Sequence, residues 1–253
     1  MIEPLLQTES LAKRFGGIVA TDDATISIAP GELHAIIGPN GAGKTTLVSQ
    51  LSDQLAPDAG RSRFAGLDIS ALPMHKRSRL GLAGSFQITS LFLDLSVLDN
   101  VALTVQAHAG HSFCFWRDAR SEPKLREPAR AAFARAGLAA RETLPAPALS
   151  HGEHRQLELA MALAGKPRML LLDQPMAGLG PEESARMVET LRALKKELTI
   201  LLIEHDMEAV FALADRITVP VYGRVIASGA PADIRANQQV RDAYLGEREA
   251  AHG

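Results

Sequence analysis

The stretch Gly38–Thr46, which reads Gly-Pro-Asn-Gly-Ala-Gly-Lys-Thr-Thr, constrains the fold of this chain more than any other. It has the pattern GxxxxGK[ST], follows an apolar run at 35–37 and precedes a segment with helical spacing at 47–51. Strand, glycine-rich loop and helix form the context that a phosphate-binding loop requires. Its backbone N–H groups and the helix N-terminus surround anionic oxygens. The motif therefore predicts a Mg²⁺-nucleoside triphosphate site, with Lys44 reaching the β- and γ-phosphates and the Thr45 hydroxyl available to Mg²⁺.

Composition narrows the class of protein further. The chain has 253 residues, of which 46% are hydrophobic and 22% are charged, as expected for a soluble globular protein of one large or two small domains. A formal net charge of -2 predicts no general attraction to nucleic acid or to anionic membranes. The single cysteine, Cys114, excludes an intrachain disulfide and favours a reducing compartment. No signal-peptide pattern and no apolar run of membrane-spanning length occurs, so we expect another chain to provide any attachment to a membrane.

The order of the expected elements indicates an α/β fold. Residues 5–35 have the pattern of short β-strands, residues 97–147 are mainly helical, and the last third alternates between strand and helix. The apolar runs at 169–172 and 199–203 are typical of parallel strands that are buried on both faces. We therefore expect one nucleotide-binding unit over 1–253 with a parallel-sheet core, an antiparallel β-subdomain and a helical subdomain. The expected limits are about 1–87 and 156–253 for the core and β-subdomain, and about 88–155 for the helical subdomain.

Two further segments have more than one interpretation. Residues 111–117 form the most aromatic patch of the chain, which is either a local hydrophobic cluster or a contact surface for a partner chain. Asp173 directly follows the apolar run at 169–172, where an acid beside a phosphate-binding loop is well placed to hold Mg²⁺, often through water. An aspartate that only ends a strand or caps a helix is the alternative, and the loop upstream favours the metal role.

The stretch Leu149–Leu157, which reads Leu-Ser-His-Gly-Glu-His-Arg-Gln-Leu, resembles the signature motif of ATP-binding-cassette (ABC) ATPases. The family's other motifs are found along nearly the whole chain in the family's order. They are the adenine-stacking aromatic residue at Phe15, the Walker A loop at Gly38–Thr46, the Q-loop glutamine at Gln87, the end of the Walker B strand at Asp173, the D-loop at 177–180 and the switch histidine at His205. The resemblance implies an ABC-type P-loop cassette.

In this family two cassettes face head to tail and enclose ATP between them. The resemblance implies that the Walker A loop of one cassette holds the phosphates, while Ser150 and Gly152 of the other cover the γ-phosphate. The residues implied to bind the nucleotide are Phe15, Asn40, Gly41, Ala42, Gly43, Lys44, Thr45, Thr46, Ser150, Gly152 and Glu153. Those implied to act in catalysis are Lys44, Gln87, Gln174 and His205, and those implied to hold Mg²⁺ are Thr45, Gln87 and Asp173.

Simpler interpretations of these residues remain open. Phe15 could be an ordinary core residue, Gln87 a polar residue at the end of a strand, and His205 a hydrogen-bonded loop histidine. Ser150 also fits the N-cap of a helix, because Glu153 follows at the spacing of a capping box. A cap and a phosphate contact are compatible roles for Ser150.

The chain departs from the family pattern at Gln174, where the family normally has a glutamate that orients or polarises the attacking water. An amide cannot accept a proton, although it fills nearly the same volume. General-base catalysis is typically worth about 10²–10⁴-fold in rate. We therefore expect this chain to bind MgATP and to hydrolyse it very slowly. The isosteric change within an intact motif suggests an engineered substitution, and a naturally altered site is the alternative.

Details of the sequence resemble the larger ATPase of branched-chain amino-acid importers. They include the segments 84–87, 91–92, 95–101, 149–153 and 203–207, the helical insertion at 104–130 and the tail at 243–247. The resemblance implies a second ATPase subunit, in a homo- or heterodimer, together with two transmembrane permease subunits and a periplasmic solute-binding protein. It also implies a peripheral location on the cytoplasmic face of the inner (plasma) membrane. The alternatives are a soluble ABC ATPase that acts on nucleic acid or ribosomes, although no nucleic-acid partner is expected, and a nucleotide-binding regulatory subunit.

Overall fold

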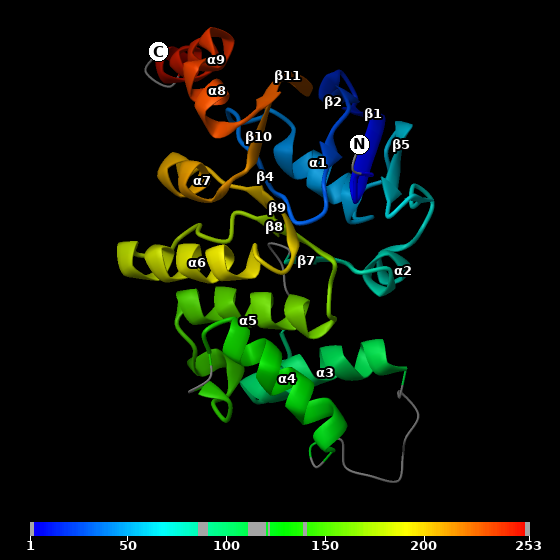
Figure 1. Ribbon diagram of the computed structural model, residues 1–253, viewed down its shortest axis with the longest axis vertical. Coiled ribbons are helices and arrows are strands. Elements are labelled where there is room, and N and C mark those ends of the chain that lie inside the picture. The colour runs from blue at the N-terminus through cyan, green and yellow to red at the C-terminus, as the bar shows by residue number, and fades with distance from the viewer. Residues whose placement is uncertain (1–2, 86–90, 111–119, 121, 139–140, 251–253) are drawn as a thin grey trace.

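The computed structural model describes residues 3–85, 91–110, 120, 122–138 and 141–250, with the backbone alone at 85 and 245–250. Gln87 and the aromatic patch at 111–117 therefore lie outside the described residues. Figure 1 shows two β-sheets with their flanking helices in the upper part and a separate helical layer below them. The elements are, in order, β1 (Leu6–Phe15), β2 (Ile18–Ala24), β3 (Ser27–Ile28), β4 (Leu33–Ile36), α1 (Lys44–Leu51), β5 (Ala59–Phe64), β6 (Leu67–Asp68), α2 (Met74–Arg79), β7 (Leu82–Ser85), α3 (Val97–Ala109), α4 (Pro123–Arg135), η3 (Ala146–Ala148), α5 (His151–Ala164), β8 (Met169–Asp173), α6 (Pro181–Leu194), β9 (Thr199–Ile203), α7 (Met207–Leu213), β10 (Arg216–Val221), β11 (Arg224–Gly229), α8 (Pro231–Ala236) and α9 (Gln238–Ala250).

The larger sheet positions the expected nucleotide site. Within the described residues its order is β11-β10-β4-β9-β8-β7, and all neighbours from β10 to β7 are parallel, while β11 is antiparallel to β10. Every residue of β4, β8 and β9 is buried, which confirms the interpretation of the continuous apolar runs. Because these strands are parallel, the P-loop after β4, Asp173 at the end of β8 and the segment after β9 meet at one edge of the sheet.

The second sheet is antiparallel and comes from the N-terminal part of the chain. Its order is β2-β1-β5-β6, with β3 paired to β1. Helix α1 joins the two sheets, because Leu47 and Leu51 share a core cluster with Phe64 of the antiparallel sheet and Leu171 of the parallel sheet. The expected parallel-sheet core and antiparallel β-subdomain are therefore confirmed.

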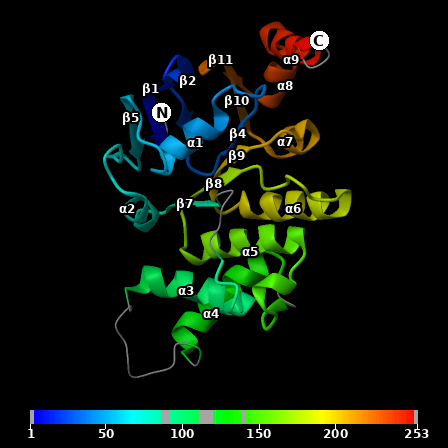
Figure 2. The ribbon, with the colours of Figure 1, turned by 180° about the vertical axis from the view of Figure 1, so that it is seen from behind.

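The helical layer consists of α3, α4 and α5, and Figure 2 shows α5 between the other two helices and the sheets. Ser96 caps α3 by accepting a hydrogen bond from the Asp99 N–H at 3.1 Å. Phe133 of α4 and Leu157 of α5 are fully buried in the core cluster that the three helices share. Helix α5 is continuous from 151 to 164, across the expected boundary at 155/156, so the proposed division into subdomains stays a prediction.

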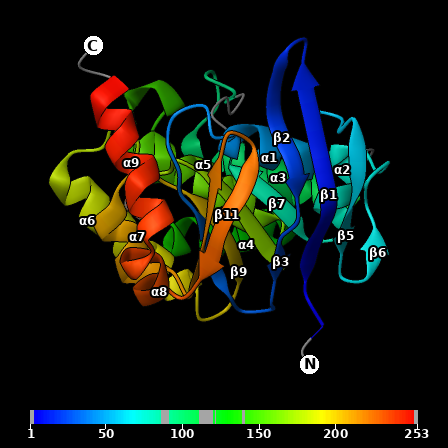
Figure 3. The same cartoon turned by 90° about the horizontal axis from the view of Figure 1, so that it is seen from above.

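The C-terminal segment adds structure that the sequence analysis did not anticipate. Helices α8 and α9 follow β11, and Ile234 and Val240 are buried in a cluster with Ile217 and Val219 of β10. Figure 3 shows these two helices beside the β10–β11 pair, on the side away from β5 and β6. Among the helices that the structure describes, none is both long enough and apolar enough to cross a membrane.

Candidate nucleotide-binding site

The P-loop is enclosed by the backbone of two neighbouring strands. Gly43 has a φ of 93°, and a Cβ atom there would lie 1.9 Å from the Ala20 carbonyl oxygen of β2. A Cβ atom on Gly38 would lie 2.5 Å from the Pro220 carbonyl oxygen of β10. A carbonyl oxygen of a paired strand cannot move aside without breaking its sheet. Glycine is therefore required at both positions, because neither has room for a Cβ atom. Gly43 also has the left-handed conformation that glycine favours.

Lys44 lies inside the curve of this loop. Its side chain is 6% exposed, and its Nζ donates hydrogen bonds to the carbonyl oxygens of Gly38 at 2.6 Å and Pro39 at 2.8 Å. The loop therefore holds its ammonium group in place before any phosphate is bound. The other loop residues of the expected site range from exposed to buried: Asn40, Gly41 and Thr45 are exposed, Gly43 and Thr46 are half-buried, and Ala42 is buried.

Asp173 and Thr45 form the expected Mg²⁺ position. Asp173 is 6% exposed, its carboxylate lies close enough to the Thr45 side chain for Thr45 to lower its pKa, and its Oδ1 is buried without a hydrogen-bond partner in the part of the chain that the structure describes. Burial raises the pKa of Asp173, while the Thr45 side chain and the charges of Lys44, His205 and Arg155 oppose that rise. A buried carboxylate oxygen beside a hydroxyl suits Mg²⁺, which also takes phosphate oxygens and water as ligands.

Within the described ranges, no group of three or more His, Cys, Asp or Glu side chains is arranged to hold a metal ion. Mg²⁺ usually keeps several water ligands and binds substrate phosphates, so a Mg²⁺ ion at Asp173 would take part of its coordination from a nucleotide. Gln87, the third expected ligand, lies outside the described residues.

Gln174 and His205 lie beside this position, on neighbouring loops. Gln174 has a φ of 53°, which is uncommon for a residue with a side chain, and its N–H donates to the Ile203 carbonyl oxygen at 2.9 Å. Its side chain is half-buried. His205 is exposed, and its charge acts on the pKa of Asp173. The structure therefore brings together five of the predicted site residues, which are Lys44, Thr45, Asp173, Gln174 and His205.

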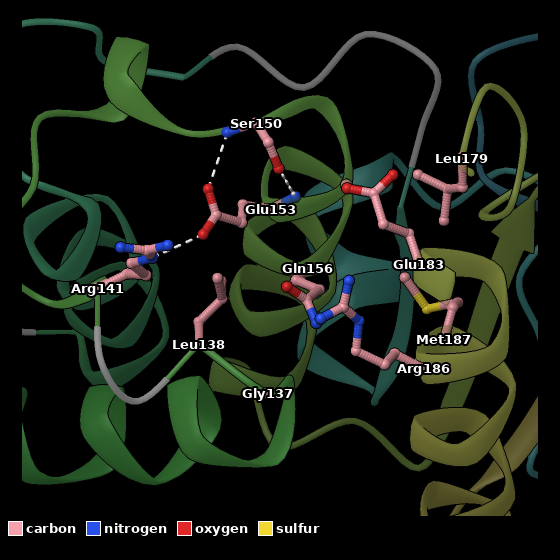
Figure 4. A pocket seen from close by; sticks show the side chains of 11 residues that line it. Gly137, Leu138, Arg141, Ser150, Glu153, Gln156, Leu179, Glu183, Arg186 and Met187 are labelled. Carbon is pink, nitrogen blue, oxygen red and sulfur yellow. Dashed lines mark hydrogen bonds and ion pairs between the residues drawn. The ribbon is translucent and has the colours of Figure 1, made fainter. Parts of the chain in front are cut away.

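The signature residues line a different pocket, of about 580 Å³, between the helical layer and α6 (Figure 4). Ser150 and Glu153 lie on one side of it, Leu179 and Glu183 lie on the facing side, and Gly152 also lines it. None of the lining residues belongs to the P-loop. In one chain, therefore, the phosphate-binding loop and the signature residues form two separate sites.

A network of hydrogen bonds fixes the signature residues. The Ser150 Oγ accepts from the Glu153 N–H at 3.2 Å, and the Glu153 carboxylate accepts from the Ser150 N–H at 2.8 Å, which confirms the predicted capping box. Arg141 donates to the same carboxylate at 2.6 Å. The hydrogen bond from Ser150 and the ion pair with Arg141 lower the pKa of Glu153. The sequence analysis missed Arg141, because no local pattern links it to a residue 12 positions away.

The start of α5 also contacts the loop that follows Gln174. A ring nitrogen of His151 lies 3.3 Å from the Ala177 carbonyl oxygen. A Cβ atom on Gly152 would lie 2.5 Å from Glu183 Oε1, so the Glu183 side chain at the start of α6 would have to shift to admit a larger residue at 152. The signature segment and the segment 177–180 therefore pack against each other.

Phe15, the expected adenine contact, ends β1 and is 50% exposed. The Lys13 Nζ lies 5.8 Å from the centre of its ring. An exposed ring favours a contact surface over an ordinary core residue, and its role toward a base stays a prediction.

Comparisons with known proteins agree with this geometry. The family described as "ABC transporter" matches residues 21–177, and the family described as "Branched-chain amino acid ATP-binding cassette transporter" matches residues 224–250. The "High-affinity branched-chain amino acid transport ATP-binding protein BraF" of Pseudomonas aeruginosa is 36% identical, over 98% of this chain and 100% of BraF. The "Lipopolysaccharide export system ATP-binding protein LptB" of Acidithiobacillus ferridurans is 34% identical, over 96% of this chain and 98% of LptB.

A solved structure has the same fold. The ADP conformation of MJ1267, "an ATP-binding cassette of an ABC transporter", superposes with a TM-score of 0.83 at 28% identity, over 96% of this chain and 99% of MJ1267. The family match covers the P-loop and Asp173, and the similarity to solved cassettes covers both sheets and the helical layer. The chain therefore belongs to the ATP-binding cassettes of ABC transporters.

Proposed function

We propose that this chain is the ATP-driven motor subunit of an importer for branched-chain amino acids or related small solutes. The observation that carries the proposal is the match of residues 224–250 to a branched-chain amino-acid transporter family. That segment forms β11, α8 and α9, outside the P-loop and the signature pocket. This segment contains none of the residues expected to bind ATP. Its match to the branched-chain amino-acid transporter family therefore supports the type of transporter, and not only the binding of ATP. The similarity to BraF supports the same assignment.

In this proposal the P-loop N–H groups and Lys44 hold the ATP phosphates, and Phe15 contacts the base. Thr45 and Asp173 hold Mg²⁺, which neutralises phosphate charge when it is bound. His205, exposed beside Asp173, reports the presence of the γ-phosphate. The half-buried amide of Gln174 hydrogen-bonds water but cannot accept its proton, so hydrolysis is slow and ATP stays bound for long periods.

The second half of the site comes from another cassette. The pocket at Ser150, Gly152 and Glu153 contains no P-loop residue of its own chain, so it is free to cover the ATP of a partner. The proposed assembly contains this chain, a second ATPase subunit, two permease subunits and a periplasmic solute-binding protein. In it the chain is a peripheral protein on the cytoplasmic face of the inner membrane.

Two measurements test this proposal. The first is purification of the tagged chain from membranes with identification of the co-purifying permease and its solute, and recovery of an amino-acid permease is the expected result. The second is the steady-state ATPase rate of the assembled complex. Gln174→Glu should raise that rate about 10²–10⁴-fold. Equal rates would contradict the slow-hydrolysis proposal without affecting the transporter assignment.

A second candidate function is ATP supply to an exporter, which the similarity to LptB favours. The purification above separates the two candidates, because an export system would yield different membrane subunits. Recovery of the chain without membrane partners, bound to nucleic acid, would contradict both.

A further inference from the structure

Glu204 is a buried carboxylate for which the proposed ATP chemistry has no use. It directly follows β9, is 4% exposed and lies next to His205 in the chain. One carboxylate oxygen accepts a hydrogen bond from the Met176 N–H at 2.7 Å, and the other accepts one from the His205 N–H at 3.0 Å. One side chain thus binds the loop after β8 and the loop after β9.

The backbone reinforces this connection. The Gln174 N–H donates to the Ile203 carbonyl oxygen at 2.9 Å, immediately before Glu204. Asp206 lies two positions after Glu204, and its N–H opposes the rise in the pKa of that carboxylate. Asp206 in turn caps α7 by accepting from the Glu208 N–H at 3.0 Å. The loop of His205 is therefore fixed at one end by β9 and at the other by a helix cap, with Glu204 between them.

Burial of a carboxylate is costly unless hydrogen bonds compensate for it. Burial raises the pKa of Glu204, and the N–H groups of Met176, His205 and Asp206 oppose that rise. In the described part of the chain no lysine or arginine forms an ion pair with Glu204, so backbone N–H groups are what stabilise its charge. A leucine in the same space would avoid the free-energy cost of burying a charge. It would, however, leave the Met176 and His205 N–H groups without their acceptor.

We propose that Glu204 is a positioning residue of the ATP site, which holds the loop of Gln174 and the loop of His205 in one fixed arrangement. A change at the γ-phosphate that moves His205 then also moves Met176 and the residues that follow it. Ala177, the next residue, contacts His151 at the start of α5. Glu204 therefore lies on a continuous set of contacts from His205 to the signature helix. This inference depends on the proposed binding of ATP.

The test uses the full chain with isotope-labelled histidine and glutamine side chains. The NMR shifts of the His205 ring and the Gln174 amide are measured with saturating MgATP and with saturating MgADP. In the wild type both signals should differ between the two nucleotides. In Glu204→Leu the difference should fall at least about twofold at both residues, because the loss of a charged acceptor loosens both loops. MgATP affinity should stay within about twofold, because Lys44 and Thr45 are untouched.

Two further variants make the result specific. Glu204→Gln keeps the shape and one acceptor oxygen, so it should retain part of the ATP–ADP difference, and it remains informative if Glu204→Leu folds poorly. Glu208→Gln is the matched control, because it removes a negative charge from a side chain that is exposed and lies four residues after Glu204. It should behave as wild type. ATP-dependent dimerisation, measured by analytical ultracentrifugation, should weaken about tenfold in Glu204→Leu and not in the control.

Each outcome has one meaning. If Glu204→Leu and Glu204→Gln both keep the wild-type difference at His205 and Gln174, Glu204 is not a positioning residue. The same follows if the wild-type signals are identical in MgATP and MgADP although both nucleotides bind. If the wild-type chain binds no MgATP, the proposed function itself fails.

Discussion

The P-loop and the signature pocket both provide N–H groups at the start of a helix, but they are held in different ways. The backbones of β2 and β10 leave no room for a Cβ atom on Gly43 or Gly38, so exclusion by the backbone shapes the P-loop. Side chains shape the signature pocket, through the capping box of Ser150 and Glu153 and the ion pair with Arg141. Substitutions should therefore break the first site through collisions and weaken the second through lost hydrogen bonds.

The largest effect should come from Gly43→Ala. The added Cβ atom would lie 1.9 Å from the Ala20 carbonyl oxygen, so β2 would have to move. The φ of 93° at residue 43 would also strain the backbone of an alanine there. We expect the free energy of unfolding to fall by about 2–5 kcal/mol and MgATP binding to be lost. Urea denaturation measures the first and equilibrium dialysis the second.

Gly17→Ala is the control for that variant, because nothing lies within 4 Å of a Cβ atom at Gly17 and its φ is not in the left-handed range. It should be nearly neutral. A Gly43→Ala protein as stable as Gly17→Ala would show that backbone exclusion does not shape the P-loop.

Ser150→Ala should have the next largest effect. Loss of an N-cap typically costs about 0.5–2 kcal/mol of stability. Ser96→Ala is a matched control, since Ser96 caps α3 in the same manner. Both variants should lose similar stability in thermal denaturation, but only Ser150→Ala should also weaken ATP-dependent dimerisation. If ATP-dependent dimerisation is equally strong in the two variants, Ser150 acts only as a helix cap.

Phe15→Leu should leave the free energy of unfolding within about 0.5 kcal/mol, because the ring is half-exposed. MgATP affinity should fall by about 0.5–1.5 kcal/mol if the ring stacks on the base, and Phe15→Tyr should restore it. Isothermal titration calorimetry measures both variants. Unchanged affinity in Phe15→Leu would end the adenine-contact role.

The smallest effect concerns pH at the signature pocket. The pKa of Glu153 is lowered in the folded chain, so its ionised form stabilises the fold above its ordinary pKa, and that contribution is lost as pH falls below about 4.5 through the folded pKa. Glu153→Gln should therefore lower the unfolding free energy by about 0.3–1 kcal/mol at pH 7, with a gap that closes on acidification. A gap that is constant from pH 7 to pH 3 would contradict this.

The two sites also differ in how far the sequence predicts them. The strand before the P-loop, the helix after it and the buried strand ending at Asp173 are confirmed, because each follows from local periodicity. The capping box at Ser150 is equally local and was predicted. Arg141, Glu183 and Glu204 were missed, because their contacts depend on helices and loops that meet only in the folded chain. The roles of the site residues stay predictions, and Gln87 lies outside the described residues.

The strands that pair with β4 in the sheet are synthesised long after β4 itself. Its partners β9 and β10 begin at Thr199 and Arg216, and the Gly223 N–H donates to the Ala42 carbonyl oxygen within the P-loop itself. On the ribosome, a nascent chain that has reached only β8 lacks both partners of β4 and one wall of the loop. We therefore expect the P-loop to be completed only after Gly223 has been synthesised, and the apolar strand β4 has no sheet partner until β9 follows it.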